Sequence, residues 1–93
     1  MTRRVRVRPE AELDLVVAAG WYEAHRRGLG AEFLNELELL VASLAENSDL
    51  YAEQLTGVRR VFARRFPYVV YYRIIDDDVV VLSIMHVRRK SRS

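Results

Sequence analysis

The strongest constraint on the fold is the connection Gly28-Leu29-Gly30, which separates two segments of helical periodicity. In each segment, apolar residues recur at spacings of three and four. A segment of about 18 residues makes a helix roughly 27 Å long, and so short a connection lets two such helices run only antiparallel. The sequence therefore predicts a helical hairpin with an apolar seam. Its two stripes are Leu13, Val16, Val17, Gly20, Trp21 and Ala24, then Phe33, Leu37, Leu40, Val41 and Leu44.

The segment before the hairpin has the two-residue alternation of a half-buried strand. Val5 and Val7 alternate with arginines, which places the valines on one face. Pro9 ends this strand and favours the first turn of a helix, and Glu10 and Glu12 then lie near the positive end of the helix dipole. We therefore expect a short strand that leads directly into the first helix.

The C-terminal half is rich in Val, Ile, Tyr and Phe, the residues that favour strands. Pro67 and the acidic turn Asp76-Asp77-Asp78 divide it, and the shortness of that turn predicts a hairpin between the last two strands. Residues 45–57 lack clean periodicity and are interpreted as a loop with a short turn of helix. The predicted strands cover residues 58–66, 68–75 and 79–86.

Together these segments predict the element order β-α-α-β-β-β. This is an α+β fold in which a helical hairpin packs on a small, mainly antiparallel sheet. Residues 1–93 are expected to form a single domain. The chain has no cysteine, which suits a reducing cytoplasm, and no apolar run approaches the roughly 20 residues of a membrane span. We therefore expect a cytoplasmic protein without membrane contact.

Positive charge is concentrated in the C-terminal part of the chain. Residues 1–56 contain six Arg and ten Asp or Glu, whereas residues 57–93 contain eight Arg, one Lys and three Asp. Five of these arginines interrupt the predicted strands, where they bind phosphate, pair with an acidic partner or face water. Their number favours an anionic partner. They are Arg59, Arg60, Arg64, Arg65 and Arg73.

The sequence offers little for metal or cofactor chemistry. His25 and His86 are the only histidines and lack the close spacing of a zinc site, and His25 is expected at the surface of a helix end. Asp76-Asp77-Asp78 either holds a divalent cation or forms an acidic turn, and we favour the turn. The tyrosines either stack on bases or pack internally, and their distribution over both strand faces favours packing. We expect no metal and no cofactor.

Three stretches resemble the RelE/ParE superfamily of bacterial toxins, the small basic partners in type II toxin–antitoxin pairs. These are Gly57-Val58-Arg59-Arg60, the run from Arg64 to Arg73 that contains Phe66-Pro67-Tyr68, and Met85-His86-Val87-Arg88-Arg89. The element order and the opening of the first helix, Pro9 to Asp14, agree with this resemblance. It covers essentially the whole chain and is closer to the ParE-like branch.

The superfamily has two modes of action. RelE-type members cut messenger RNA on the ribosome, which requires cations that hold the phosphate and groups for proton transfer. Members similar to ParE inhibit DNA gyrase by binding it. Here Tyr68 stands where the cleaving branch commonly has an arginine, no aromatic residue follows His86, and residues 45–57 contain neither Lys nor Arg. These differences favour gyrase inhibition, with no catalytic residue. The nuclease alternative would use His86, Arg64, Arg73 and Arg60.

The resemblance also implies partners and biological consequences. A ParD-like antitoxin would neutralise the toxin with an amphipathic helix and an extended segment, and DNA would be contacted only through that complex. Growth arrest and plasmid stabilization are implied as well. The remaining alternatives are a ribosome-dependent mRNA endoribonuclease and a non-toxic module that only binds the antitoxin.

The resemblance and the charge pattern together give a set of expected binding residues. We expect His86 to be structural rather than catalytic. The expected target-binding residues are Arg73, Arg88, Arg89 and Lys90. The expected antitoxin-binding residues are Val17, Trp21, Leu37, Val41, Arg59 and Arg65.

Overall fold

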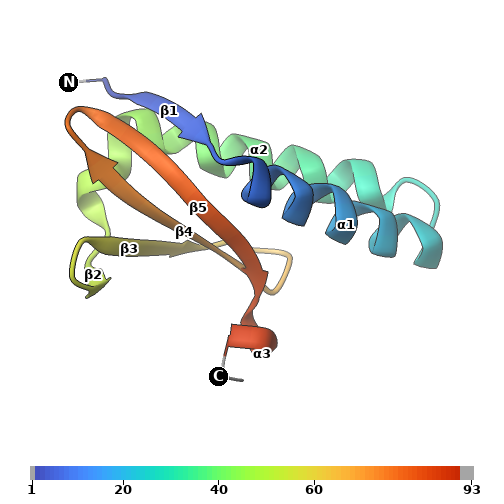
Figure 1. The fold of residues 1–93 in the computed structure, drawn as a ribbon. Coiled ribbons are helices and arrows are strands. Elements are labelled where there is room, and N and C mark those ends of the chain that lie inside the picture. Colours follow the sequence, from blue (N-terminus) through green and yellow to red (C-terminus); the bar gives the residue numbers. More distant parts are fainter. Residues whose placement is uncertain (1, 91–93) are drawn as a thin grey trace.

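The computed structural model describes residues 2–90, with side chains described through residue 88. Two long helices pack on one face of a five-stranded sheet (Figure 1), as the α+β prediction requires. The elements in chain order are β1 (Arg4–Val7), α1 (Pro9–His25), α2 (Leu29–Asn47), the 3-10 turn η1 (Ser48–Leu50), β2 (Glu53–Leu55), β3 (Val58–Phe62), β4 (Tyr68–Ile75), β5 (Asp78–His86) and α3 (Val87–Lys90).

The strand order in the sheet is β1-β5-β4-β3-β2. β1 runs parallel to β5, and the other neighbours are antiparallel, so the predicted mainly antiparallel sheet is confirmed. β2 lies inside the segment that was predicted as a loop. Its three residues are all exposed, so they carry no apolar alternation that would have indicated a strand.

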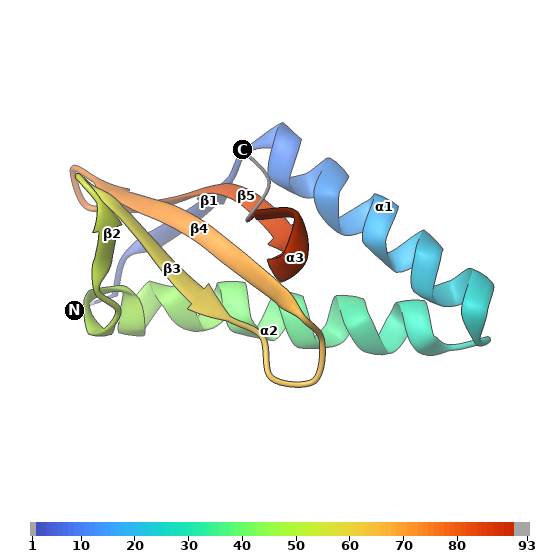
Figure 2. The same ribbon diagram turned by 90° about the horizontal axis from the view of Figure 1, so that it is seen from below.

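The helices meet at the connection around Gly28 and diverge toward the sheet (Figure 2). Gly28 has a φ of 88°, a left-handed conformation that glycine adopts without strain. A Cβ at Gly30 would lie 2.7 Å from the Ala19 carbonyl oxygen, so only glycine lets α1 and α2 approach this closely. The predicted antiparallel hairpin is therefore confirmed.

The core lies between the helices and the sheet. α2 buries the stripe predicted for it, with Phe33, Leu37, Val41 and Leu44 at most 8% exposed. The central strands β4 and β5 supply most of the opposing side chains. Those that are fully buried are Val70, Tyr72, Val79 and Val81.

The prediction for the inner face of α1 was wrong. Leu13, Val17 and Trp21 are each more than half exposed. The helix instead buries a stripe of small residues, Ala11, Ala18 and Ala19, flanked by the half-buried Leu15 and Tyr22. Alanines let α1 lie close to α2 and β5, whereas leucine or tryptophan there would hold the helices apart. The larger side chains are therefore displaced to the outer face.

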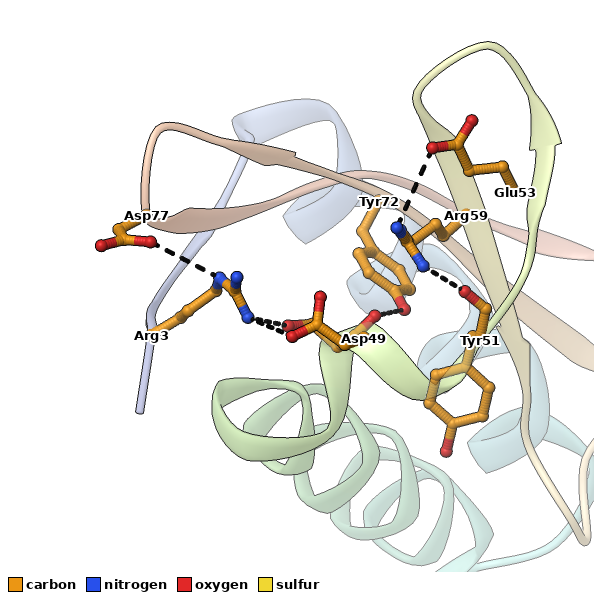
Figure 3. Close-up of polar contacts among 8 residues, drawn as sticks. Arg3, Asp49, Tyr51, Glu53, Arg59, Tyr72 and Asp77 are labelled. Atoms are coloured by element: carbon orange, nitrogen blue, oxygen red, sulfur yellow. Dashed lines mark hydrogen bonds and ion pairs between the residues drawn. The ribbon is translucent and has the colours of Figure 1, made fainter. Parts of the chain in front are cut away.

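Arg3 ties the start of the chain to two distant turns. Its Nη1 donates to an Asp49 carboxylate oxygen at 2.8 Å, and its Nε lies 3.9 Å from Asp77 (Figure 3). Ser48, next to Asp49, is fully buried, and its carbonyl oxygen accepts a hydrogen bond of 2.7 Å from the Tyr72 hydroxyl. Burial raises the pKa of Tyr72 to about 12. This network fixes the end of α2 against the sheet.

Replacing Tyr72 by phenylalanine should lower the free energy of unfolding by about 1–3 kcal/mol, because the buried Ser48 carbonyl loses its donor. The neighbouring Tyr71 supplies a matched control. Its hydroxyl is buried without a hydrogen-bond partner among the described residues, so Tyr71→Phe should leave stability unchanged or slightly higher. Urea unfolding of both variants measures the difference. Equal losses would contradict the assigned role of the Tyr72–Ser48 bond.

The Arg3–Asp49 pair should make stability depend on pH. The hydrogen bond from Arg3 holds the pKa of Asp49 below its ordinary value. A lowered carboxyl pKa stabilises the fold above the unfolded-state pKa of about 3.9, and that contribution disappears as pH falls through the folded-state pKa. Asp49→Asn should therefore be destabilising at neutral pH, and in thermal unfolding its difference from wild type should shrink as pH falls through the folded-state pKa of Asp49.

Asp76→Asn is the control for this pH dependence. Asp76 lies in an exposed turn at a φ of 57°, which asparagine tolerates, and it has no ion pair in the described part of the chain. The thermal stability of Asp76→Asn should depend on pH in the same way as that of wild type. If Asp49→Asn behaves in the same way, the Arg3 network does not stabilise the protein as we describe.

Candidate functional site

An apolar groove of about 630 Å³ lies between α1 and the C-terminal half of β5, and we call it the α1–β5 groove. Its α1 wall is formed by Leu13, Val17 and Trp21, which are 62%, 58% and 58% exposed. Large apolar residues grouped at a concave surface are typical of sites that bind a partner. Its floor and opposite wall include Ala18, Tyr22, Tyr68, Ile84, Met85 and His86.

The groove exists because β5 extends beyond its neighbour β1. β1 pairs only with the part of β5 from Asp78 to Val81, whereas β5 continues to His86. α1 lies beside the remaining edge, where an Asp14 carboxylate oxygen accepts the Ile84 N–H at 2.9 Å. No local sequence pattern indicates this contact, because 70 residues separate its two partners.

His86 lies at one end of the α1–β5 groove, and its contacts give it a structural role. Its ring packs edge-on against Tyr68, with ring centroids 5.2 Å apart. Its Nδ1 accepts the Arg88 N–H at 3.1 Å, so the imidazole caps the first turn of α3. A ring nitrogen that accepts a hydrogen bond carries no proton. Its neighbour Val87 donates its N–H to the Pro67 carbonyl oxygen at 2.9 Å.

The arginines of the nuclease alternative do not gather around His86. In the β4–β5 register, His86 lies opposite Tyr68 and Arg73 lies opposite Val80. Arg73 lies five residue steps from Tyr68 along β4, which is about 17 Å. His86 lines the groove on the helix side, whereas Val80 and Arg73 belong to the opposite face. One phosphate group cannot contact both side chains at this separation.

Arg60 and Arg64, the other two arginines of the nuclease alternative, also have different surroundings from His86. The Arg60 guanidinium is 5.1 Å from the centroid of the Phe62 ring. Arg64 is exposed in the turn after β3, where Glu36 accepts the backbone N–H groups of Arg64 and Arg65 at 2.6 and 3.0 Å. These bonds end β3 at Phe62, earlier than the predicted end at Phe66. They also join residues 28 or more positions apart, beyond the reach of local patterns.

Two of the arginines expected to contact an antitoxin are already engaged within the chain. Arg59 Nη1 donates to the Tyr51 carbonyl oxygen at 2.6 Å, and its Nη2 lies 3.9 Å from Glu53 (Figure 3). Arg65 Nη2 lies 2.9 Å from Glu32 and lowers the pKa of that carboxyl. A partner that binds Arg59 or Arg65 would have to replace these contacts. The two arginines therefore have a structural role first, and any role in recognition requires that these contacts break.

The other expected antitoxin-binding residues divide by burial. Val17 and Trp21 are exposed in the α1–β5 groove, whereas Leu37 and Val41 lie in the core and are 0% and 8% exposed. The burial of Leu37 and Val41 is the physical consequence of α2 packing on the sheet. It leaves their side chains almost no surface for a partner, and we remove both from the candidate surface.

The expected target-binding residues are only partly described. Arg73 and Arg88 are exposed. The side chains of Arg89 and Lys90 lie outside the described residues, although both belong to the backbone of α3. Arg73 and Arg88 therefore remain the described members of this predicted set.

The acidic turn and His25 take the structural roles predicted for them. Asp78 pairs with Arg4 at 3.2 Å and Arg6 at 3.6 Å. The exposed His25 stacks on Trp21, with ring centroids 3.9 Å apart. Within the described residues, no three His, Asp or Glu side chains are grouped so as to hold a metal ion, and no helix is long and apolar enough to cross a membrane.

The structure is that of a small α+β domain with an apolar groove, and comparisons with known proteins show its family. Residues 5–91 match the family model described as the ParE toxin of the type II toxin–antitoxin system, parDE. Because this match spans nearly the whole chain, the chain belongs to the ParE toxin family. No protein with a curated description matches it.

Two solved structures share the fold. The chromosomal ParDE toxin–antitoxin system from P. aeruginosa superposes with a TM-score of 0.81 at 19% identity, covering 92% of this chain and 97% of that one. The toxin–antitoxin complex RelBE2 from Mycobacterium tuberculosis gives a TM-score of 0.61 at 24% identity, covering 92% and 99%. These similarities confirm the predicted RelE/ParE-like fold, and the chain is a type II toxin of this superfamily.

Proposed function

We propose that this toxin acts by binding DNA gyrase and that a ParD-like antitoxin neutralises it by occupying the α1–β5 groove. The observation that carries the first part is the separation of His86 from the arginines. Cleavage of RNA requires a proton-transfer group and phosphate-binding cations around one reacting centre. In this chain, His86 and Arg73 lie on opposite faces of the sheet, about 17 Å apart along the strand.

The contacts of His86 support the same conclusion. The Arg88 amide engages Nδ1 and the ring packs on Tyr68, so only Nε2 is left for proton transfer, and Arg73 does not lie beside it to hold a phosphate. Inhibition of gyrase by binding does not require a proton-transfer group. It needs charged residues that a large partner can reach, and Arg73 and Arg88 are both exposed, at separate places on the surface.

The α1–β5 groove fits an amphipathic helix of the antitoxin. Leu13, Val17 and Trp21 recur at spacings of four on α1, so they form one continuous apolar row beside β5. A helix laid in such a groove buries apolar anchors along the row. Trp21 has the largest side chain of the three and is expected to contribute most.

His86→Asn separates the gyrase and nuclease mechanisms. Asparagine retains a side-chain acceptor that can cap α3, but it lacks the imidazole needed for proton transfer. The variant should still slow supercoiling by purified gyrase with the potency of wild type. Arg73→Glu reverses an exposed charge and should weaken inhibition by about tenfold or more. Cleavage of ribosome-bound mRNA that His86→Asn abolishes would instead establish the nuclease.

The antitoxin site can be tested with neighbouring positions on one helix. Trp21→Ala should weaken antitoxin binding by about thirtyfold, the effect of losing a hot-spot tryptophan, and Val17→Ala should weaken it less. Val16 is the matched control, because it is 64% exposed on the same helix but does not line the groove. Titration calorimetry with the antitoxin encoded beside the toxin measures each change. Equal effects at Val16 and Val17 would place the interface elsewhere.

A further inference from the structure

One face of the sheet carries no long helix, and we call it the helix-free face. Both α1 and α2 lie on the other side of the sheet (Figure 1). Side chains alternate between the two faces along a strand, and Val7, Val61 and Tyr72 pack in the core on the helix side. Their neighbours in the sequence therefore point to the helix-free face. These neighbours include Arg6 of β1, Arg60 of β3 and Arg73 of β4.

The strand register brings these three arginines into one band across the sheet, which we call the arginine band. Arg6 and Arg73 both lie opposite Val80 of β5, so their Cα atoms are about 10 Å apart. Arg60 lies opposite Tyr71, two residues from Arg73, which puts it about 8 Å from Arg73. The band spans about 16 Å, the length of about five base pairs of duplex DNA.

Positive charge on the helix-free face exceeds the negative charge that could pair with it. Arg4 also points to this face, and Arg4 and Arg6 share the carboxylate of Asp78 at 3.2 and 3.6 Å. Asp78 is the only acid in the described strands β1, β3, β4 and β5. Arg60 and Arg73 have no ion pair within the described residues. One acid among four arginines leaves three positive charges uncompensated.

The middle of the helix-free face lacks the exposed apolar side chains that anchor a protein partner. Val80, within the arginine band, is 7% exposed, and Val69 on the same face is fully buried. The large apolar side chains that are exposed there, Phe62 and Ile75, lie at the ends of their strands. Cations without central apolar anchors are typical of a surface that binds nucleic-acid phosphates.

The same face offers no platform on which unpaired bases could stack. Proteins that bind single strands present exposed aromatic rings to successive bases. Tyr71 is the aromatic residue beside the arginine band, and it is half-buried with a buried hydroxyl group. The surface therefore suits a duplex, whose bases are already paired and whose phosphates face outward. Contacts to phosphate alone carry no sequence information.

We propose that the helix-free face binds the phosphate backbone of duplex DNA through Arg6, Arg60 and Arg73. A guanidinium group can donate two parallel hydrogen bonds to one phosphate group, so the band holds three phosphates. The family resemblance implies contact with DNA only through the antitoxin complex, whereas this contact belongs to the toxin itself. None of the three arginines lines the α1–β5 groove, so an antitoxin helix bound in that groove leaves them accessible.

The test measures binding of the full chain to a fluorescent duplex of about 20 base pairs by anisotropy, between about 50 and 200 mM salt. Three phosphate contacts predict a slope of about −2.7 for log K against log salt concentration, a loss of roughly fortyfold in affinity over this range. Arg6→Gln and Arg60→Gln should each reduce the slope by about one. A duplex of unrelated sequence should bind equally well.

Arg27→Gln is the matched control. Arg27 is an exposed arginine in the turn between α1 and α2, at the end of the hairpin away from the sheet (Figure 2). Its replacement removes the same charge and should leave affinity and slope unchanged. Thermal unfolding of all three variants verifies that each retains the fold.

Four results would overturn the proposal. They are a slope that Arg6→Gln and Arg60→Gln leave unchanged, an equal loss with Arg27→Gln, and tighter binding of a single strand of the same length. The fourth is displacement of the duplex by polyglutamate at equal charge concentration, which would assign the face to an acidic protein. The assay contains neither gyrase nor antitoxin. A toxin that binds gyrase in the absence of DNA but fails to bind the duplex would therefore contradict only this proposal.

Discussion

The position of β5 between β1 and β4 is the constraint on which the rest of the structure depends. β5 pairs with β1 on one side and with β4 on the other, α1 packs along its free edge, and α3 continues from its end. Its valines Val79 and Val81 are fully buried. A single strand thus sets the position of both helices relative to the sheet, and the α1–β5 groove follows from its extra length.

Much of this architecture follows from sequence, because its determinants are local. Gly28 permits the tight hairpin, Pro9 begins α1, and the apolar run of β5 is typical of a central strand. The inner face of α1 was not predictable from its largest residues, because α1 is apolar on more than one side. The spacing of Ala11, Leu15, Ala18 and Tyr22 carried the correct signal, but only contact with α2 favours small residues.

The candidate site was less predictable, because arginines that look alike in the sequence have different surroundings in the fold. Arg59 and Arg65 hold turns and helix ends together, whereas Arg60, Arg64 and Arg73 lie at open surfaces. The residues that distinguish them are acids such as Glu53 and Glu32, which engage Arg59 and Arg65. Net charge predicts an anionic partner, and tertiary contacts decide which cations are available to such a partner.

The parallel pairing of β1 with β5 has a consequence for the order of events during synthesis. Arg4 pairs with Asp78 and Val7 with Val81, so β1 remains without its neighbour until the chain through β5 has left the ribosome. Contacts of such long sequence separation form late and slow folding. A chain whose translation stops before β5 can complete neither the sheet nor the α1–β5 groove.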